Sequence, residues 1–276
     1  MTRRQMSETI RVGFVGTGRM ATALAGGLVS SGFCQPESVV GSDVVGAAAE
    51  AFAASTGGST VDSNAQVAAV SDVIILAIKP QTMPEVLDEL AGAITSDHLV
   101  ISIAAGITLN RLTDALGRST RIVRVMPNTP CLVGLSASAF AVGEAATEAD
   151  SELVARLLAT VGVAFPVDEE LIDAVTGLSG SGPAYVYEVI EAMALGGVAC
   201  GLPRDVALQL AAVTVKGAAE MVLKTGEPPE ALRDAVASPG GTTIAGLAEL
   251  ERLGLRDVLK SAVEAATRRS QELGEE

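Results

Sequence analysis

Aromatic residues, cysteine and histidine are all scarce in this chain, and each shortage narrows what the protein can do. Aromatic residues make up 3% of the 276 residues and tryptophan is absent, so alanine, valine, leucine and isoleucine must fill the core. The three cysteines, Cys34, Cys131 and Cys200, form no CxxC pair, which argues against both a disulfide framework and a zinc site. We therefore expect a metal-free protein of the reducing cytoplasm.

Positive charge is also in short supply. Lysine and arginine number 19 against 33 acidic residues, for a formal net charge of -14. The electrostatic field of such a negative net charge repels a polyanion, and no stripe of basic residues offsets it. We therefore expect no nucleic-acid partner. No apolar segment of signal-peptide type precedes a cleavage site, and prolines and glycines interrupt the longest uncharged stretch, 125–143. We expect a soluble protein with no membrane partner.

The first part of the chain alternates strand-like and helix-like segments. Continuous apolar runs bounded by polar residues are typical of buried parallel strands. Strands are expected over 10–15, 39–42, 72–78, 99–103, 121–125 and 137–142, and helices over 21–30 and 46–55. This order predicts an α/β domain with a doubly wound sheet over residues 1–168.

The remaining residues, 169–276, contain no convincing strand and are expected to be all helical. The helices are expected over 184–199, 204–224, 229–236, 243–253 and 255–272. Residues 206–223 are apolar on most faces apart from Lys216 and Glu220, and a helix of that kind is usually buried on several sides. We expect a second subunit to provide part of that burial; the alternative is a monomer in which the N-terminal domain covers these helices.

A glycine-rich turn follows the first expected strand. The segment VGFVGTGRMA, 12–21, matches the dinucleotide-binding fingerprint with Ala21 in the third glycine place. There the first glycine permits the tight turn, the second lets the backbone approach a pyrophosphate, and the helix N-terminus offers free N–H groups. The pattern predicts a Rossmann-type domain whose dinucleotide contacts are Gly16, Thr17, Gly18, Arg19 and Met20.

The choice of dinucleotide depends on the end of the second strand. Asp43 stands about where an acidic residue usually contacts the adenosine ribose. Its carboxylate would accept from the 2'-hydroxyl of NADH and repel the 2'-phosphate of NADPH. Alternatively, Ser42 donates to that phosphate with Arg19 nearby. The residues leave both readings open, so the expected cofactor is NADPH or NADH.

A second glycine-rich segment lies at 234–250, where Gly240 and Gly241 follow a proline and Thr242 and Thr243 open a helix. Free N–H groups at such a helix start can hold a carboxylate, and the hydroxyls of Ser238 and Thr243 add polar contacts. The alternative is an ordinary N-cap without a ligand.

Five segments, in order along the chain, resemble marked segments of pyrroline-5-carboxylate reductases. They are AIKP at 77–80, SIAAG at 102–106, MPNTP at 126–130, DAVTGLSGSGPAY at 173–185 and SPGGTTIAGLAELE at 238–251. The resemblance extends from Ile10 to Leu273. It implies a Rossmann-type domain, a helical domain that interlocks in a homodimer, larger assemblies of dimers, and an active site between the cofactor domain and helices of the partner subunit.

The resemblance also implies an activity, the NAD(P)H-dependent reduction of 1-pyrroline-5-carboxylate to L-proline, which ends proline biosynthesis. In this reading the loop from Ser238 to Thr243 holds the substrate carboxylate, and the Thr243 hydroxyl reaches the ring nitrogen. Asn64 matches a cofactor-contacting position. The nicotinamide side would be lined by Ala77, Ile78, Lys79, Pro80, Ala104, Ala105 and Gly106.

Two other functions fit the residues less well. A β-hydroxyacid dehydrogenase would carry lysine and asparagine where this chain has Val186 and Ile190, so that chemistry would lose its base. A nucleotide sensor without turnover would not need the intact SPGGTT loop. The only histidine, His98, precedes an expected strand rather than following one, which disfavours a role as the catalytic acid.

Overall fold

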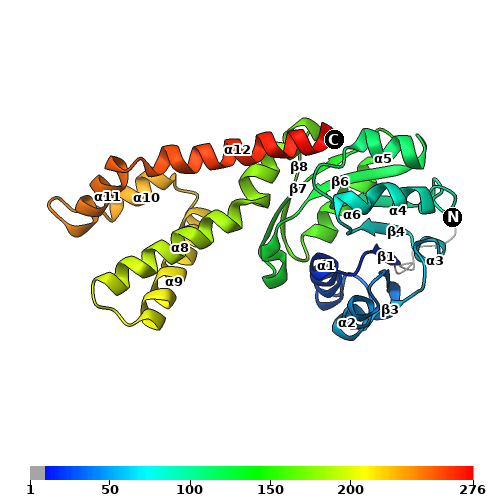
Figure 1. Cartoon of the computed structure of the whole chain (residues 1–276), viewed down its shortest axis with the longest axis horizontal. Coiled ribbons are helices and arrows are strands. Elements are labelled where there is room, and N and C mark those ends of the chain that lie inside the picture. Colours follow the sequence, from blue (N-terminus) through cyan, green and yellow to red (C-terminus); the bar gives the residue numbers. More distant parts are fainter. Residues whose placement is uncertain (1–9, 276) are drawn as a thin grey trace, which may run out of the picture. The chain divides into compact units, whose positions relative to one another are not determined.

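The computed structural model describes residues 10–275, and the chain divides into two compact units (Figure 1). The first unit runs to Gly180 and takes up the chain again at Ala265, while the second unit is Ser181–Glu264.

A single eight-stranded sheet forms the centre of the first unit, with strand order β3-β2-β1-β4-β5-β6-β7-β8. Neighbouring strands are parallel except β6 and β7, which are antiparallel. The strands are β1 (Val12–Val15), β2 (Val39–Ser42), β3 (Ser59–Thr60), β4 (Val73–Leu76), β5 (Leu99–Ser102), β6 (Arg121–Met126), β7 (Ser136–Val142) and β8 (Gly162–Pro166). The strand order reverses between β1 and β4, and the crevice at such a switch point is where open α/β sheets bind ligands.

Helices cover both faces of this sheet, which is why its strands read as continuous apolar runs. The α-helices of the unit are α1 (Arg19–Ser30), α2 (Gly46–Thr56), α3 (Asn64–Val70), α4 (Met83–Leu90), α5 (Leu109–Leu116), α6 (Glu148–Leu158) and α7 (Ile172–Val175). Short 3-10 turns lie at η1 (Pro36–Ser38), η2 (Pro80–Thr82), η3 (Thr129–Val133) and η4 (Glu169–Leu171), and a π-helical turn at η5 (Thr176–Gly180).

Two apolar clusters make up the core, one on each face of the sheet. Phe14 and Ile75 belong to the cluster beneath α1 and α6, whereas Ile74 and Leu76 belong to the cluster beneath α4 and α5. Successive residues of a strand point to opposite faces, so the unbroken run of β4 supplies both clusters.

The predicted doubly wound α/β fold is confirmed, and the strand over 39–42 has the predicted bounds. Two strands were not predicted. β3 is only two exposed residues long, and β8 is an edge strand that ends on Pro166 with Phe165 60% exposed, so neither carries a buried apolar run.

The segment after Asp168 packs with the first unit as far as Gly180. Ile172 is buried in the core, and Glu169 forms an ion pair with Arg124 of β6. The boundary that the sequence predicts at Asp168 stays a prediction.

The second unit is helical, as predicted. It holds α8 (Gly182–Ala199), α9 (Arg204–Thr225), α10 (Pro229–Ala235), α11 (Thr242–Arg252) and the start of α12 (Leu255–Glu275). Helices α8 and α9 pack through small residues: Ala194, Ala207 and Ala211 are buried, and a Cβ on Gly197 would lie 3.3 Å from that of Ala207.

Much of α9 is apolar and exposed. Leu210, Val213 and Leu223 are 54%, 67% and 79% exposed. By length and composition alone, α9 is the one helix within residues 10–275 that could cross a membrane. It is not the uncharged stretch 125–143 that the sequence analysis considered. Apolar exposure on this scale marks a surface that contacts another protein or a membrane.

Candidate functional site

The glycine-rich turn joins the end of β1 to α1 at the switch point of the sheet. Gly16 has a φ of +87°, and a Cβ there would lie 2.7 Å from the Ala77 carbonyl oxygen, so glycine is required on both counts. A Cβ on Gly18, by contrast, would meet no atom of the described chain within 4 Å. The backbone at Gly18 is therefore open to a ligand, as the fingerprint predicts.

The N-terminus of α1 has the form of a phosphate site. Gly18 is its N-cap, and within residues 10–275 no side chain caps it. The first N–H groups of a helix lack partners inside the helix and carry partial positive charge. Arg19 and Met20 open the helix here, so their main-chain N–H groups can donate to a pyrophosphate.

Asp43 turns toward the glycine-rich turn. Its Oδ2 accepts from the main-chain N–H (2.8 Å) and the hydroxyl (3.1 Å) of Thr17, and its Oδ1 accepts from the N–H of Val45 (2.9 Å). Thr17 is itself buried. Asp43 thus fixes the turn to the end of β2, which the sequence alone did not reveal.

Ser42 and Asn64 lie beside Asp43 and are joined to each other. The Ser42 hydroxyl donates to Oδ1 of Asn64 at 2.6 Å, and Ser42 is only 3% exposed. Asn64 is half-buried at the start of α3. Because the Ser42 proton is already used, its hydroxyl has none to give to a 2'-phosphate unless this bond breaks.

The expected nicotinamide side follows β4 and β5, the strands next to β1. The Ala77 N–H donates to the Val15 carbonyl at 2.8 Å, so Ala77 to Pro80 start directly beside the glycine-rich turn. The residues from Ala104 to Gly106 leave the same edge of the sheet after β5. Gly106 has a φ of +74° and lies against Leu273 of α12. Both segments therefore lie at the carboxyl ends of the central strands, the edge of the sheet where a ligand is expected.

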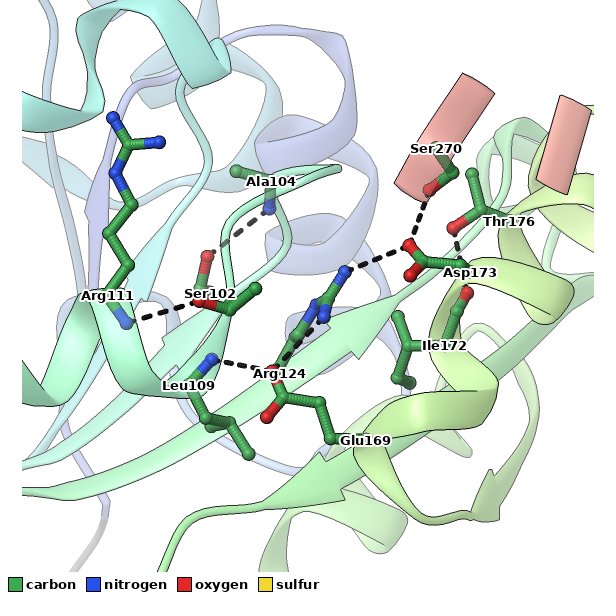
Figure 2. A network of polar contacts seen from close by, with 11 residues as sticks. Ser102, Ala104, Leu109, Arg111, Arg124, Glu169, Ile172, Asp173, Thr176 and Ser270 are labelled. Atoms are coloured by element: carbon green, nitrogen blue, oxygen red, sulfur yellow. Dashed lines mark hydrogen bonds and ion pairs between the residues drawn. The ribbon is translucent and has the colours of Figure 1, made fainter. Parts of the chain in front are cut away.

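A buried arginine that the sequence analysis missed stands nearby on β6. Figure 2 shows Arg124 between Glu169 and Asp173, with Ser270 bonded to the same Asp173 oxygen, Oδ1, that Arg124 contacts. The Arg124 guanidinium lies 3.1 Å from Glu169 and 3.5 Å from Asp173, and Ser270 donates to Asp173 at 2.7 Å. The network ties residues 169–173 and the end of α12 to the sheet. An arginine inside the apolar run RIVRVM was the signal available for it.

Two further motifs meet at the end of β6. The side chain of Asn128, in MPNTP, donates to the Ser179 carbonyl at 3.0 Å and accepts from the Ala137 N–H at 3.0 Å. A Cβ on Gly180 would lie 2.6 Å from the Met126 methyl group. Asn128 therefore holds the π-helical turn against the sheet, and Gly180 lets it come close.

In the second unit, the loop before α11 leaves a helix start open. Gly240 has a φ of +71°, and a Cβ on Gly241 would lie 2.5 Å from the Ser238 hydroxyl oxygen, so both positions require glycine. Gly241 is the N-cap of α11, and no side chain in the described part of the chain caps this helix. The ordinary N-cap considered from the sequence is therefore not formed, and the N–H groups of Thr242 and Thr243 remain for an anion.

Two further polar residues, His98 and Tyr185, have structural partners. His98 lies just before β5, where it accepts from the Thr95 N–H at 2.9 Å, as expected for a residue outside the site. Tyr185 donates to the Ala262 carbonyl at 3.4 Å within the second unit.

Comparison with known proteins agrees with this arrangement over the whole chain. Residues 169–273 match the family described as pyrroline-5-carboxylate reductase dimerisation, and residues 11–106 match the family described as NADP oxidoreductase, coenzyme F420-dependent. The pyrroline-5-carboxylate reductase of Arabidopsis thaliana is 46% identical over 98% of this chain and 97% of its own. That of Methanosarcina acetivorans is 48% identical over 97% of this chain and 99% of its own.

A solved structure extends the likeness to three dimensions. The pyrroline carboxylate reductase of Plasmodium falciparum, solved with NADP bound, superposes with a TM-score of 0.88 at 34% identity, over 97% of this chain and 99% of that one. With an identity above 45% along almost its full length, the chain belongs to the pyrroline-5-carboxylate reductase family.

Proposed function

We infer that this protein reduces 1-pyrroline-5-carboxylate to L-proline with NADPH or NADH, the last step of proline biosynthesis. The observation that carries the inference is the pair of open helix starts, one at Gly18 and one at Gly241, in a chain of this family. One suits the pyrophosphate of a dinucleotide and the other the carboxylate of the substrate.

The residues present fit a bound dinucleotide. The space in front of Gly18 is open to the described chain, and the first N–H groups of α1 await an acceptor. We propose that the contacts come from Gly16 to Met20, from Asp43 and Asn64 near the ribose, and from the segments at Ala77 and Ala104 near the nicotinamide. We also keep Ser42 among the proposed contacts, although its side chain is almost fully buried and can offer the cofactor only a small surface. The cofactor, when bound, supplies a hydride to the C=N carbon.

The chain's own part in the reaction is alignment. The N–H groups of Thr242 and Thr243 hold the substrate carboxylate, with Ser238 beside them, and the Thr243 hydroxyl orients the ring nitrogen. A protonated imine is already electrophilic, so positioning in a site that excludes water supplies most of what the reaction needs.

We further propose that the protein works in the cytoplasm as a homodimer or a larger assembly of dimers. The exposed apolar residues of α9 support this, because they lie inside the region that matches the dimerisation family. A second subunit covering them also accounts for the membrane-like composition of α9. All three cysteines are free, as a reducing compartment requires.

Steady-state oxidation of NADPH and of NADH with the imine substrate tests the activity directly. Gly16→Ala should abolish cofactor binding, because the added methyl group would collide with the Ala77 carbonyl. Gly26→Ala on α1 is the matched control, since a Cβ there meets no atom of the described chain within 4 Å. An absence of turnover with either cofactor in folded wild-type protein would refute the proposal.

A further inference from the structure

A continuous polar chain runs from the end of β2 to α4. Its first link is the bond from the Ser42 hydroxyl to Oδ1 of Asn64. Its second link is a two-point attachment of Asn64 to Glu89 of α4. Glu89 accepts from the Asn64 main-chain N–H at 3.1 Å and from its Nδ2 at 2.6 Å.

These partners determine which way the Asn64 amide faces. A carboxylate can only accept, so the amide nitrogen must be the atom directed at Glu89. The amide oxygen then faces Ser42, whose hydroxyl supplies the proton. Within residues 10–275, the second N–H of Nδ2 has no acceptor. Because Glu89 binds both the backbone and the side chain of Asn64, it also restricts the side-chain torsions.

The Asn64 amide lies where the adenosine part of the cofactor is expected, so its second N–H can donate to that part. Ser42 ends β2 and Asp43 follows it, and residues at the end of that strand in a doubly wound sheet lie by the adenosine ribose. Asn64 is half-buried there, while Glu89 is exposed on α4. An exposed carboxylate adds little to stability, because water competes for its hydrogen bonds. The same two hydrogen bonds restrict the orientation of the Asn64 amide, whatever they add to stability.

We propose that Glu89 is a positioning residue for the dinucleotide: it holds Asn64 so that the free amide N–H donates to the adenosine part of the cofactor. The inference rests on the proposed function, since it needs a dinucleotide in this site. Glu89 itself touches no reacting atom.

E89Q tests the orientation while keeping the shape of the side chain. Glutamine offers only one accepting oxygen, so either the main-chain N–H or Nδ2 of Asn64 loses its acceptor, and the amide is released or reversed. We expect the Kd and KM for NADPH to rise about tenfold, as for one misplaced hydrogen bond. The kcat at saturating cofactor should stay within about twofold, and the KM for the imine should not change.

The matched control is E85Q, which removes the same charge from an exposed position one turn earlier on α4. Its Kd for NADPH should equal that of the wild type. A cycle of N64A, E89Q and the double variant then separates positioning from stability. If Glu89 acts through Asn64, the double variant binds NADPH no more weakly than N64A does.

Two results would overturn the proposal. One is an E89Q variant that binds NADPH as tightly as E85Q. The other is additive losses in the cycle together with a lowered Tm of the cofactor-free E89Q protein, which would assign Glu89 a purely structural role. Failure of the proposed function is distinct, because then the wild-type protein itself would neither bind nor oxidise NADPH or NADH.

Discussion

Replacing Asp43 by serine tests whether this carboxylate repels the 2'-phosphate of NADPH. Asp43→Ser has two separable effects. It removes a negative charge from the end of β2, and it removes acceptors from the N–H groups of Thr17 and Val45 and from the Thr17 hydroxyl. The second effect loosens the glycine-rich turn that both cofactors use. It therefore weakens NADPH and NADH alike and cancels in the ratio of their kcat/KM values.

The charge effect does not cancel. Two unit charges 4 Å apart interact by about 1 kcal/mol in bulk water and about 4 kcal/mol at a protein surface. Asp43 is partly exposed and its oxygens already accept three hydrogen bonds, so the lower part of that range applies. With about 1–2 kcal/mol of repulsion removed, the NADPH/NADH ratio of kcat/KM should rise by a factor of about 5–30.

The assay is steady-state oxidation of each cofactor with saturating imine, followed by absorbance of the reduced nicotinamide. Ser42→Ala and Arg19→Ala test the opposite reading, in which these two residues receive the phosphate and their loss selectively damages NADPH use. An Asp43→Ser variant with lower activity but an unaltered NADPH/NADH ratio would refute the repulsion argument and leave Asp43 only its bonds to the turn.

Three further predictions concern the second unit and the thiols. Thr243→Ala should lower kcat/KM by a factor of about 5–150, equivalent to about 1–3 kcal/mol of lost transition-state stabilisation, while NADPH binding stays intact; unchanged kinetics in a folded variant would remove Thr243 from the site. Light scattering should show an oligomer, and Val213→Asp on the exposed face of α9 should shift its mass toward monomer; an active wild-type monomer across dilution would contradict this. Burial raises the pKa of the Cys34 and Cys131 thiols, so thiolate-directed reagents at neutral pH should label the exposed Cys200 first. Cys200→Ser should remove the fast phase of labelling, and a fast phase that persists would show that the reagent reaches a buried thiol.

The fold could be predicted from the sequence because its signals are local. The apolar run of β4 and the spacing of Gly16 and Gly18 each lie within a few residues, and the geometry they require is the geometry observed. Edge elements were harder. β8 has exposed Val163 and Phe165, so its pairing with β7 rather than its own pattern makes it a strand.

Partners distant in sequence could not be predicted. Nothing near Asp43 says that its acceptors will be taken by Thr17, 26 residues away. The same holds for Arg124, whose partner Asp173 is 49 residues further on. Such pairs depend on which strands become neighbours, so the residue types at a site can be read from sequence more readily than the directions in which they point.

The return of the last residues to the first unit affects how this chain can be made and cut. Ser270 bonds to Asp173, and the backbone of Leu273 lies against Gly106, although more than 80 residues of the other unit intervene. During synthesis, the final contacts of the cofactor-binding unit can therefore form only after the residues from Ala265 onward have been made. A protease cut at Gly180 would not release that unit whole, because its last helical segment would leave with the other piece.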